Sequence, residues 1–290
     1  MAVNMPSISK IYDDLMAQAD PLCENFPLMG SPVVFFSIIG LYLIIVWKGP
    51  TWMAPYKPLE LKPLLVVYNI LLVILALYIS LGTLKYIVLG GGYPVLFYAV
   101  ERTRTHENRE FHAMIGWWFC MSKLIEFLDT VFFILRKKNS HINFLHVYHH
   151  ATMAVFTWLG LKFLPGGSNI MYPLLNSMVH SLMYTYYGLS ALGPRFHKYL
   201  WWKKYVTMIQ IGQFVVYLLQ DVINILYGNT LPKIFCYPAY AYTVSILILF
   251  VRFYLRAYSK NSVKKADHAV ENGTHKNGAI ATNGECKKSE

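Results

Sequence analysis

Seven long apolar segments constrain the fold of this chain more than any other feature. They occupy 31–47, 63–84, 113–135, 142–163, 169–192, 205–227 and 235–251. Each approaches the roughly 20 residues that an α-helix needs to cross a bilayer. Because the bilayer core offers no water to the backbone, only helices and closed barrels cross it, and runs this long favour helices. The sequence therefore predicts an all-α integral membrane protein with seven transmembrane helices.

The composition also indicates a membrane protein. Only 14% of the 290 residues are charged, whereas soluble domains carry about 25%. The net charge of +11 is spread over short clusters between the apolar segments. Such clusters are typical of loops that face anionic headgroups or acidic substrates, so we expect a lipid bilayer as a partner and no nucleic acid.

The distribution of Lys and Arg predicts the orientation. When 1–30 is a non-cytosolic segment, most basic residues fall on the cytosolic side, in 48–62, 136–138, 195–204 and the tail. The positive-inside rule then places the C-terminus in the cytosol. We expect 257–290 to be a disordered cytosolic tail, because it is rich in Lys, Asn, Gly and Ser. Its ending, KKSE, resembles the dilysine retrieval signal of endoplasmic-reticulum membrane proteins.

Four polar clusters interrupt the predicted spans, and polar groups within a membrane mark functional sites by default. One cluster, FLHVYHHATM, carries three histidines spaced i, i+3 and i+4, which share one face of a helix. The other three are KLIEFLDT, HSLMYTYY and TMIQIGQ. The predicted topology places all four in the cytosolic half of one bundle, where they can form a single site. Their candidate residues are His146, His149, His150, Lys123, Glu126, Asp129, His180, Tyr184, Tyr187, Gln210 and Gln213.

Each cluster taken alone also fits a structural role. Lys123 with Glu126 fits an intramembrane ion pair, the tyrosines fit aromatic packing near an interface, and the glutamines fit hydrogen bonding between helices. Their joint occurrence favours one functional site over four unrelated structural features.

A metal centre is the first alternative for the histidines, because imidazoles bind iron and zinc and HxxHH boxes occur in di-iron desaturases and hydroxylases. Those enzymes draw their ligands from several boxes, and this chain has no second box. A zinc ion held by three histidines stays open, but no HExxH-type base accompanies it. A seven-span transporter or receptor is the other alternative. We expect no metal.

Acyl transfer suits the site better. A neutral imidazole can accept an acyl group from a thioester when a neighbour orients its second nitrogen. Basic loops at the same face suit the phosphates of coenzyme A. Cys120 is a rival nucleophile, but nothing nearby in the sequence marks it as activated. The four cysteines form no CxxC pair, and Cys23 can pair with Cys236 only if both face the lumen.

The four clusters, in this order, resemble the signature boxes of the ELO family of very-long-chain fatty-acid elongases. FFILRKK and YLWWKKY also look like that family, and the resemblance covers 31–256. It implies a seven-span endoplasmic-reticulum enzyme with six helices around a narrow acyl tunnel. The implied reaction joins acyl-CoA to malonyl-CoA and gives 3-oxoacyl-CoA, carbon dioxide and CoA without a cofactor.

The resemblance also implies roles for individual residues. His149, the middle histidine of the box, would become acylated before malonyl-CoA enters, while its two neighbours orient it and move protons. His180 would lie near the enolate, and the KLIEFLDT residues would hold the histidines. The implied catalytic set is His149, His146, His150, His180, Lys123, Glu126 and Asp129. The implied substrate-binding set is Asn176, Tyr184, Tyr187, Gln210, Gln213, Lys203 and Lys204.

Two further features bear on substrate and partners. Tyr148 in HVYHH resembles the branch that acts on polyunsaturated and very long chains, whereas saturated-chain branches often have Phe or Trp there. Several animal relatives carry a cysteine soon after the GGY turn, and GGGYPVLF lacks it, which puts a lumenal disulfide in doubt. The family implies a homo-oligomer and the reductase and dehydratase of the elongation cycle as partners.

Overall fold

The structure is a computed structural model that describes residues 7–89, 109–226 and 233–258. Within these ranges every regular element is a helix, as predicted. The chain divides into two units, of which the first ends at Leu247 and the second begins at Ile248. The predicted dilysine signal and the GGGYPVLF segment lie outside the described residues.

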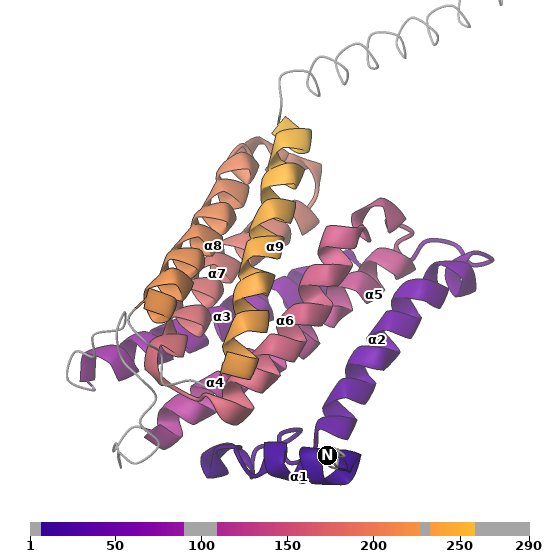
Figure 1. Cartoon of the computed structure of the whole chain (residues 1–290). Helices are drawn as coiled ribbons and strands as arrows, with labels where there is room; N and C mark the ends of the chain where they lie inside the picture. Colours follow the sequence, from indigo (N-terminus) through magenta and orange to yellow (C-terminus); the bar gives the residue numbers. More distant parts are fainter. Residues whose placement is uncertain (1–6, 90–108, 227–232, 259–290) are drawn as a thin grey trace, which may run out of the picture. The chain divides into compact units, whose positions relative to one another are not determined.

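The described helices coincide with the seven predicted segments (Figure 1). The long ones are α2 (Pro32–Met53), α3 (Lys62–Leu89), α6 (Phe144–Phe163), α7 (Met171–Ala191), α8 (Lys203–Leu226) and α9 (Lys233–Tyr258). The segment predicted at 113–135 is two helices, α4 (Arg109–Ile125) and α5 (Phe127–Leu135), which meet at Glu126. The shorter elements are α1 (Ile8–Met16), η1 (Pro21–Cys23), η2 (Asn139–His141), η3 (Gly167–Ile170) and η4 (Pro194–Tyr199).

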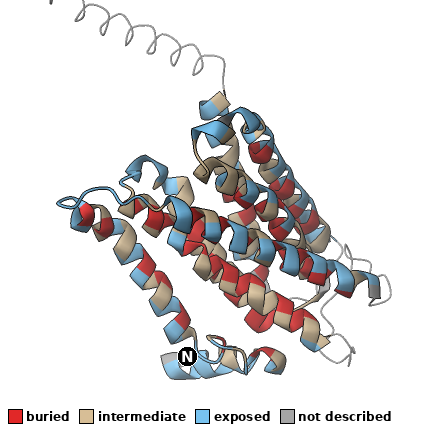
Figure 2. Cartoon of the chain, turned by 180° about the vertical axis from the view of Figure 1, so that it is seen from behind, coloured by how far each residue is buried: buried red, intermediate tan, exposed pale blue. Residues whose placement is uncertain are grey.

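Four of the described helices are long and apolar enough to cross a membrane. They are Pro32–Met53, Lys62–Val88, Lys203–Leu226 and Cys236–Tyr258. Figure 2 shows buried residues on the sides where helices face one another and exposed residues on the opposite sides. Those exposed sides carry large apolar residues such as Trp47, Leu81 and Leu219, an arrangement that water would not tolerate over so large an area. The protein is therefore a multi-pass membrane protein, and α6 and α7 are less apolar because they carry the histidines and their polar neighbours.

Close contacts fix the helices that carry the site. A Cβ atom at Gly82 of α3 would lie 2.6 Å from Ile115 Cδ1, so α3 and α4 pack closely here and a larger residue would require the Ile115 side chain to move. On the other side of the break, Tyr42 of α2 stacks on Phe127 of α5 with a centroid distance of 4.0 Å. Together these contacts hold both halves of the broken helix in place.

The N-terminal segment packs against α4 and α6. Arg109 forms an ion pair with the buried Asp20, and Trp158 Nε1 donates to Leu28 O at 3.0 Å. Cys23 Sγ donates to Leu161 O at 3.1 Å, and its thiol is free, as is that of Cys236. The disulfide that the sequence left open between these two cysteines is therefore not formed. Burial, with the charge of Asp20 as a second cause, raises the pKa of the Cys23 thiol to about 12.

Candidate active site

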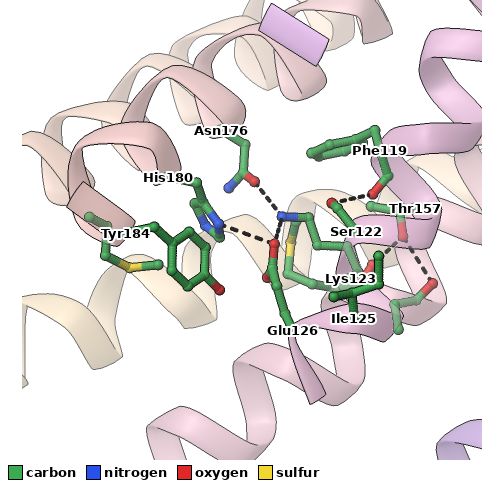
Figure 3. A network of polar contacts seen from close by, with 12 residues as sticks. Phe119, Ser122, Lys123, Ile125, Glu126, Thr157, Asn176, His180 and Tyr184 are labelled. Carbon is green, nitrogen blue, oxygen red and sulfur yellow. Dashed lines mark hydrogen bonds and ion pairs between the residues drawn. The ribbon is translucent and has the colours of Figure 1, made fainter. Parts of the chain in front are cut away.

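The break between α4 and α5 places a buried ion pair at the centre of the site. Lys123 Nζ donates to Glu126 Oε1 at 2.7 Å and to Asn176 Oδ1 of α7 at 2.7 Å (Figure 3). Lys123 is 2% exposed and Glu126 is 3% exposed. The ring of Phe119 also lies 4.8 Å from the ammonium nitrogen. Because a buried charge is costly unless it is paired and hydrogen-bonded, these contacts account for a lysine at this depth.

Helix α7 faces this break with polar side chains at one-turn intervals. After Asn176 comes His180, whose Nδ1 lies 3.2 Å from Glu126 Oε1, within ion-pair distance but off the hydrogen-bond direction. One turn later, Tyr184 Oη donates to Asp129 Oδ2 at 3.0 Å. The two predicted clusters KLIEFLDT and HSLMYTYY therefore do meet, through the contacts of His180 and Tyr184. Asn176, one turn before the second cluster, adds a third contact between α7 and the α4–α5 pair.

The histidine box occupies the first two turns of α6. The helix begins where Asn143 accepts a hydrogen bond from the backbone N–H of His146, at 3.0 Å. His146 Nε2 lies 2.7 Å from Thr130 Oγ1 of α5, which joins the box to the segment after the break. The rings of His146 and His150 have centroids 4.4 Å apart and are tilted by 56°, so these two histidines pack in one cluster.

His149 points toward a different neighbour. Its Nδ1 lies 3.2 Å from Tyr242 Oη of α9, and its ring meets Phe214 of α8 edge-on at 6.3 Å. The same face of α9 receives Tyr148, whose hydroxyl lies 2.7 Å from Ser245 Oγ. Glu126 and His180 also lie within electrostatic range of His149, so the histidine box and the ion-pair network belong to one site.

A cavity of about 160 Å³ adjoins this site and is lined by residues of α4, α6, α7, α8 and α9. Four lining residues also contact the polar groups described above. Phe119 and Asn176 contact Lys123, while Phe214 and Tyr242 contact His149. Most of the remaining lining is apolar, so the space fits a hydrocarbon chain. The histidines of the box do not line this space themselves, and His149 is linked to it through Phe214 and Tyr242.

The predicted substrate-binding residues do not all lie at the site, and some are exposed on the outside of the helices. Gln213 is buried in α8, and Gln210 Nε2 lies 3.4 Å from Met183 Sδ of α7. Tyr187, in contrast, is 44% exposed. Of the predicted substrate-binding residues, only Asn176 lines the cavity. Lys203 and Lys204 are exposed at the start of α8.

The basic loops come together near the start of α6. His141 of η2 has a lowered pKa, first because it is partly buried and then because positive charges lie near it. These charges belong to Lys203, Lys138 and Arg136, and they show that the start of α8 approaches the loop between α5 and α6. A cluster of cationic side chains therefore lies beside the helix that carries the histidine box.

Sequence reasoning did not single out Tyr242, although it contacts the central histidine. Its helix is apolar and rich in tyrosine, so one more tyrosine carries no signal, and only the short polar run YTVS sets it apart.

Within the part of the chain that the structure describes, no group of three His, Cys, Asp or Glu side chains is arranged to hold a metal ion. The histidine nitrogens contact hydroxyl groups and a carboxylate instead.

Comparison with known proteins identifies the chain at the level of family. Residues 27–266 match the profile of the ELO family, described as the GNS1/SUR4 family. The chain belongs to the ELO family. Very long chain fatty acid elongase 4 of Homo sapiens is 42% identical over 264 residues, which are 90% of this chain and 82% of that protein.

Two further ELO relatives match over a longer share of their own length. Very long chain fatty acid elongase 5 of Tachysurus fulvidraco is 38% identical over 281 residues, covering 95% of this chain and 94% of that protein. Very long chain fatty acid elongase 7 of Rattus norvegicus is 38% identical over 277 residues, covering 92% and 95%. The family resemblance that the four boxes predicted is confirmed.

Proposed function

We propose that the protein is the condensing enzyme of fatty-acid elongation. It joins a long-chain or very-long-chain acyl-CoA to malonyl-CoA and releases 3-oxoacyl-CoA, carbon dioxide and CoA. One observation carries this proposal: the histidine box and the Lys123–Glu126 network each contact residues that line a largely apolar cavity. A thioester and its hydrocarbon chain therefore each find a matching environment at adjacent positions.

The first step is acyl transfer to His149. When its Nδ1–H donates to Tyr242 Oη, the lone pair stays on Nε2, which is the nucleophilic nitrogen. Nε2 attacks the thioester carbonyl, an N–C bond forms, the C–S bond breaks and CoA leaves as a thiolate. Tyr242 acts here as a positioning residue, because it fixes which ring nitrogen carries the proton.

The second step forms the new carbon–carbon bond. Malonyl-CoA loses carbon dioxide, and the resulting enolate carbon attacks the acyl carbon while the N–C bond to His149 breaks. His180 is held 3.2 Å from Glu126 Oε1, and that carboxylate supports a positive charge on the imidazole when it stabilises the enolate oxygen. Lys123 and Asn176 fix the position of Glu126 and therefore of His180.

The membrane arrangement belongs to the same proposal. Seven helical segments would each cross the endoplasmic-reticulum membrane, with the C-terminus in the cytosol. Six of them are the single helices α2, α3, α6, α7, α8 and α9, and the seventh is formed by α4 and α5 together. The cavity between α4, α6, α7, α8 and α9 supports an acyl tunnel surrounded by six helices. Lys203 and Lys204 stand where they can meet the phosphates of CoA, beside the basic loop before α6.

The substrate preference and the partners are finer parts of the proposal. Tyr148 supports a preference for polyunsaturated and very long chains, because that residue type resembles the branch acting on such chains; its hydroxyl contacts Ser245 of α9. The proposed partners include the reductase and dehydratase of the elongation cycle, because a 3-oxoacyl-CoA product must be reduced and dehydrated before the next round of elongation. A homo-oligomer is also part of the proposal.

Intact-mass spectrometry after incubation with acyl-CoA alone tests the covalent step. We expect the mass of one acyl group on the wild-type protein and on the control variant His141→Ala, and none on His149→Ala. An adduct that persists on His149→Ala would assign the acyl group to another residue. A second assay adds labelled malonyl-CoA, and failure of the wild-type protein to form 3-oxoacyl-CoA would refute the condensing function itself.

The same second assay separates the alternatives. An elongase forms product without oxygen and in the presence of a metal chelator, whereas a di-iron desaturase requires both iron and oxygen. A transporter or receptor would leave acyl-CoA and malonyl-CoA chemically unchanged.

A further inference from the structure

We propose that the far end of the cavity binds a hydroxyl group, so that ω-hydroxyacyl-CoA is a further substrate class of this enzyme. This inference rests on the proposed elongase function, because it concerns the chain that the same cavity would hold. The chemistry at the thioester end stays as described, and only recognition of the opposite end of the chain is new.

The cavity lining changes character along its length. Near His149 it is formed by aromatic and apolar residues such as Phe119, Phe156 and Phe214. At the other end it is formed by polar residues of the first turn of α4, of η3 and of the last turns of α8, namely His112, Asn169 and Asn224. His112 precedes Lys123 by three turns of α4, which corresponds to roughly 16 Å along the helix axis. The polar end is therefore well separated from the reacting groups.

His112 is the clearest sign that this end binds a polar group. It is 6% exposed, its ring stacks on Tyr86 with a centroid distance of 4.4 Å, and it lines the cavity. Its Nδ1 has no hydrogen-bond partner among the described residues. Buried polar atoms nearly always have a partner, so an unpaired nitrogen on a cavity wall indicates a group that the cavity receives.

A buried carboxylate lies behind the wall at the same end. Asp221 is 1% exposed, and its Oδ1 accepts a hydrogen bond from Tyr172, a residue of the cavity wall. Thr243, a second residue of the wall, also lies near this carboxylate. The end of the cavity thus combines the unpaired His112 nitrogen with the amide groups of Asn169 and Asn224.

These groups favour a hydroxyl over the other ends that a fatty acyl chain can carry. A methyl end would keep the polar atoms away from water without giving them a partner. A carboxylate end would lie near the buried carboxyl group of Asp221, which is hydrogen-bonded to Tyr172 of the wall, and two negative charges at this depth repel each other. A hydroxyl is neutral and both donates and accepts, so it can pair with His112 and with an amide at the same time.

The test compares three acyl-CoA substrates of one chain length in the elongation assay: unsubstituted, ω-hydroxylated and hydroxylated at mid-chain. We expect wild-type kcat/KM for the ω-hydroxy chain to equal or exceed that for the unsubstituted chain. The mid-chain hydroxyl would lie among the aromatic residues, so its kcat/KM should fall on the order of tenfold. This comparison uses the wild-type protein and does not depend on any variant folding.

A pair of variants then assigns the effect to His112. His112→Phe keeps a ring against Tyr86 but removes both nitrogens, so the ratio of kcat/KM for ω-hydroxy to unsubstituted chains should fall on the order of tenfold. His112→Gln restores a hydrogen-bonding group and should recover most of that ratio. As a matched control, Met153→Leu in the apolar part of the wall should leave the ratio unchanged even if it alters both rates.

Three results would overturn the inference. If the wild-type protein elongates only unsubstituted chains, this inference is wrong while the proposed function stands. If His112→Phe leaves the ratio unchanged, the polar end holds water alone. If no chain is elongated at all, the proposed function fails and the inference fails with it.

Discussion

Replacing Lys123 with methionine removes the cation that balances Glu126 in the buried network. Methionine is of similar length and apolar, so the change is electrostatic rather than steric. It removes two hydrogen bonds of 2.7 Å, to Glu126 and Asn176, and leaves a carboxylate that is 3% exposed. Loss of one partner of a buried ion pair costs about 3–5 kcal/mol. For a chain of this size that corresponds to a fall of about 6–20 °C in the unfolding temperature.

Tryptophan emission of the purified protein during heating measures the effect. The double variant Lys123→Met with Glu126→Gln should recover at least half of the loss, because the uncompensated negative charge is gone. Lys57→Met is the matched control, since Lys57 is exposed in a loop and its replacement should change stability by less than about 0.5 kcal/mol. The reasoning is refuted if Lys123→Met unfolds at the wild-type temperature, or if the double variant is no more stable than the single one.

Three further predictions concern other parts of the molecule. Tyr242→Phe should slow formation of the acyl adduct about tenfold through loss of one hydrogen bond, whereas Tyr237→Phe on the exposed side of the same helix should not; equal rates would contradict the positioning role. Replacing Lys203 and Lys204 together with alanine should raise KM for acyl-CoA and weaken its dependence on salt, as KM measured at two ionic strengths would show. An unchanged KM would exclude these lysines from CoA binding. Because burial raises the pKa of Cys23 to about 12, its thiol stays protonated at pH 8 and should react with a maleimide only after unfolding, which peptide mass analysis can follow. Rapid labelling of the folded protein would contradict that environment.

The helices could be predicted from sequence because the signal that marks them is long. Each apolar run covers four or more turns, so an error of two or three residues at an end does not change its type. The break at Glu126 could not be predicted in this way. KLIEFLDT continues a helical pattern, and Glu126 itself keeps helical dihedral angles and donates its N–H to Ser122 O at 2.9 Å. The departure is one residue long, which is finer than hydrophobic periodicity can resolve.

The site was predictable to a similar extent. Intramembrane charges and histidines stand out against an apolar background, so their clusters could be found and even paired across helices. Tyr242 and His112 could not be found, because a tyrosine in an aromatic helix and a histidine at the start of a span are unremarkable in sequence. Tyr187 shows the reverse limitation: its ring packs 6.0 Å from that of Tyr184, as the spacing predicts, yet Tyr187 is 44% exposed whereas Tyr184 is 1% exposed.

The three contacts between α7 and the α4–α5 pair have a consequence for how this enzyme can change. Asn176, His180 and Tyr184 follow one another at single turns, so sliding α7 by one turn, about 5.4 Å, would mismatch every contact at once. Intermediate positions satisfy none of them. These three contacts therefore form or fail together when α7 packs against the α4–α5 pair. The residues that line the opposite end of the cavity take no part in these contacts, which leaves that end free to diverge between relatives that handle different chains.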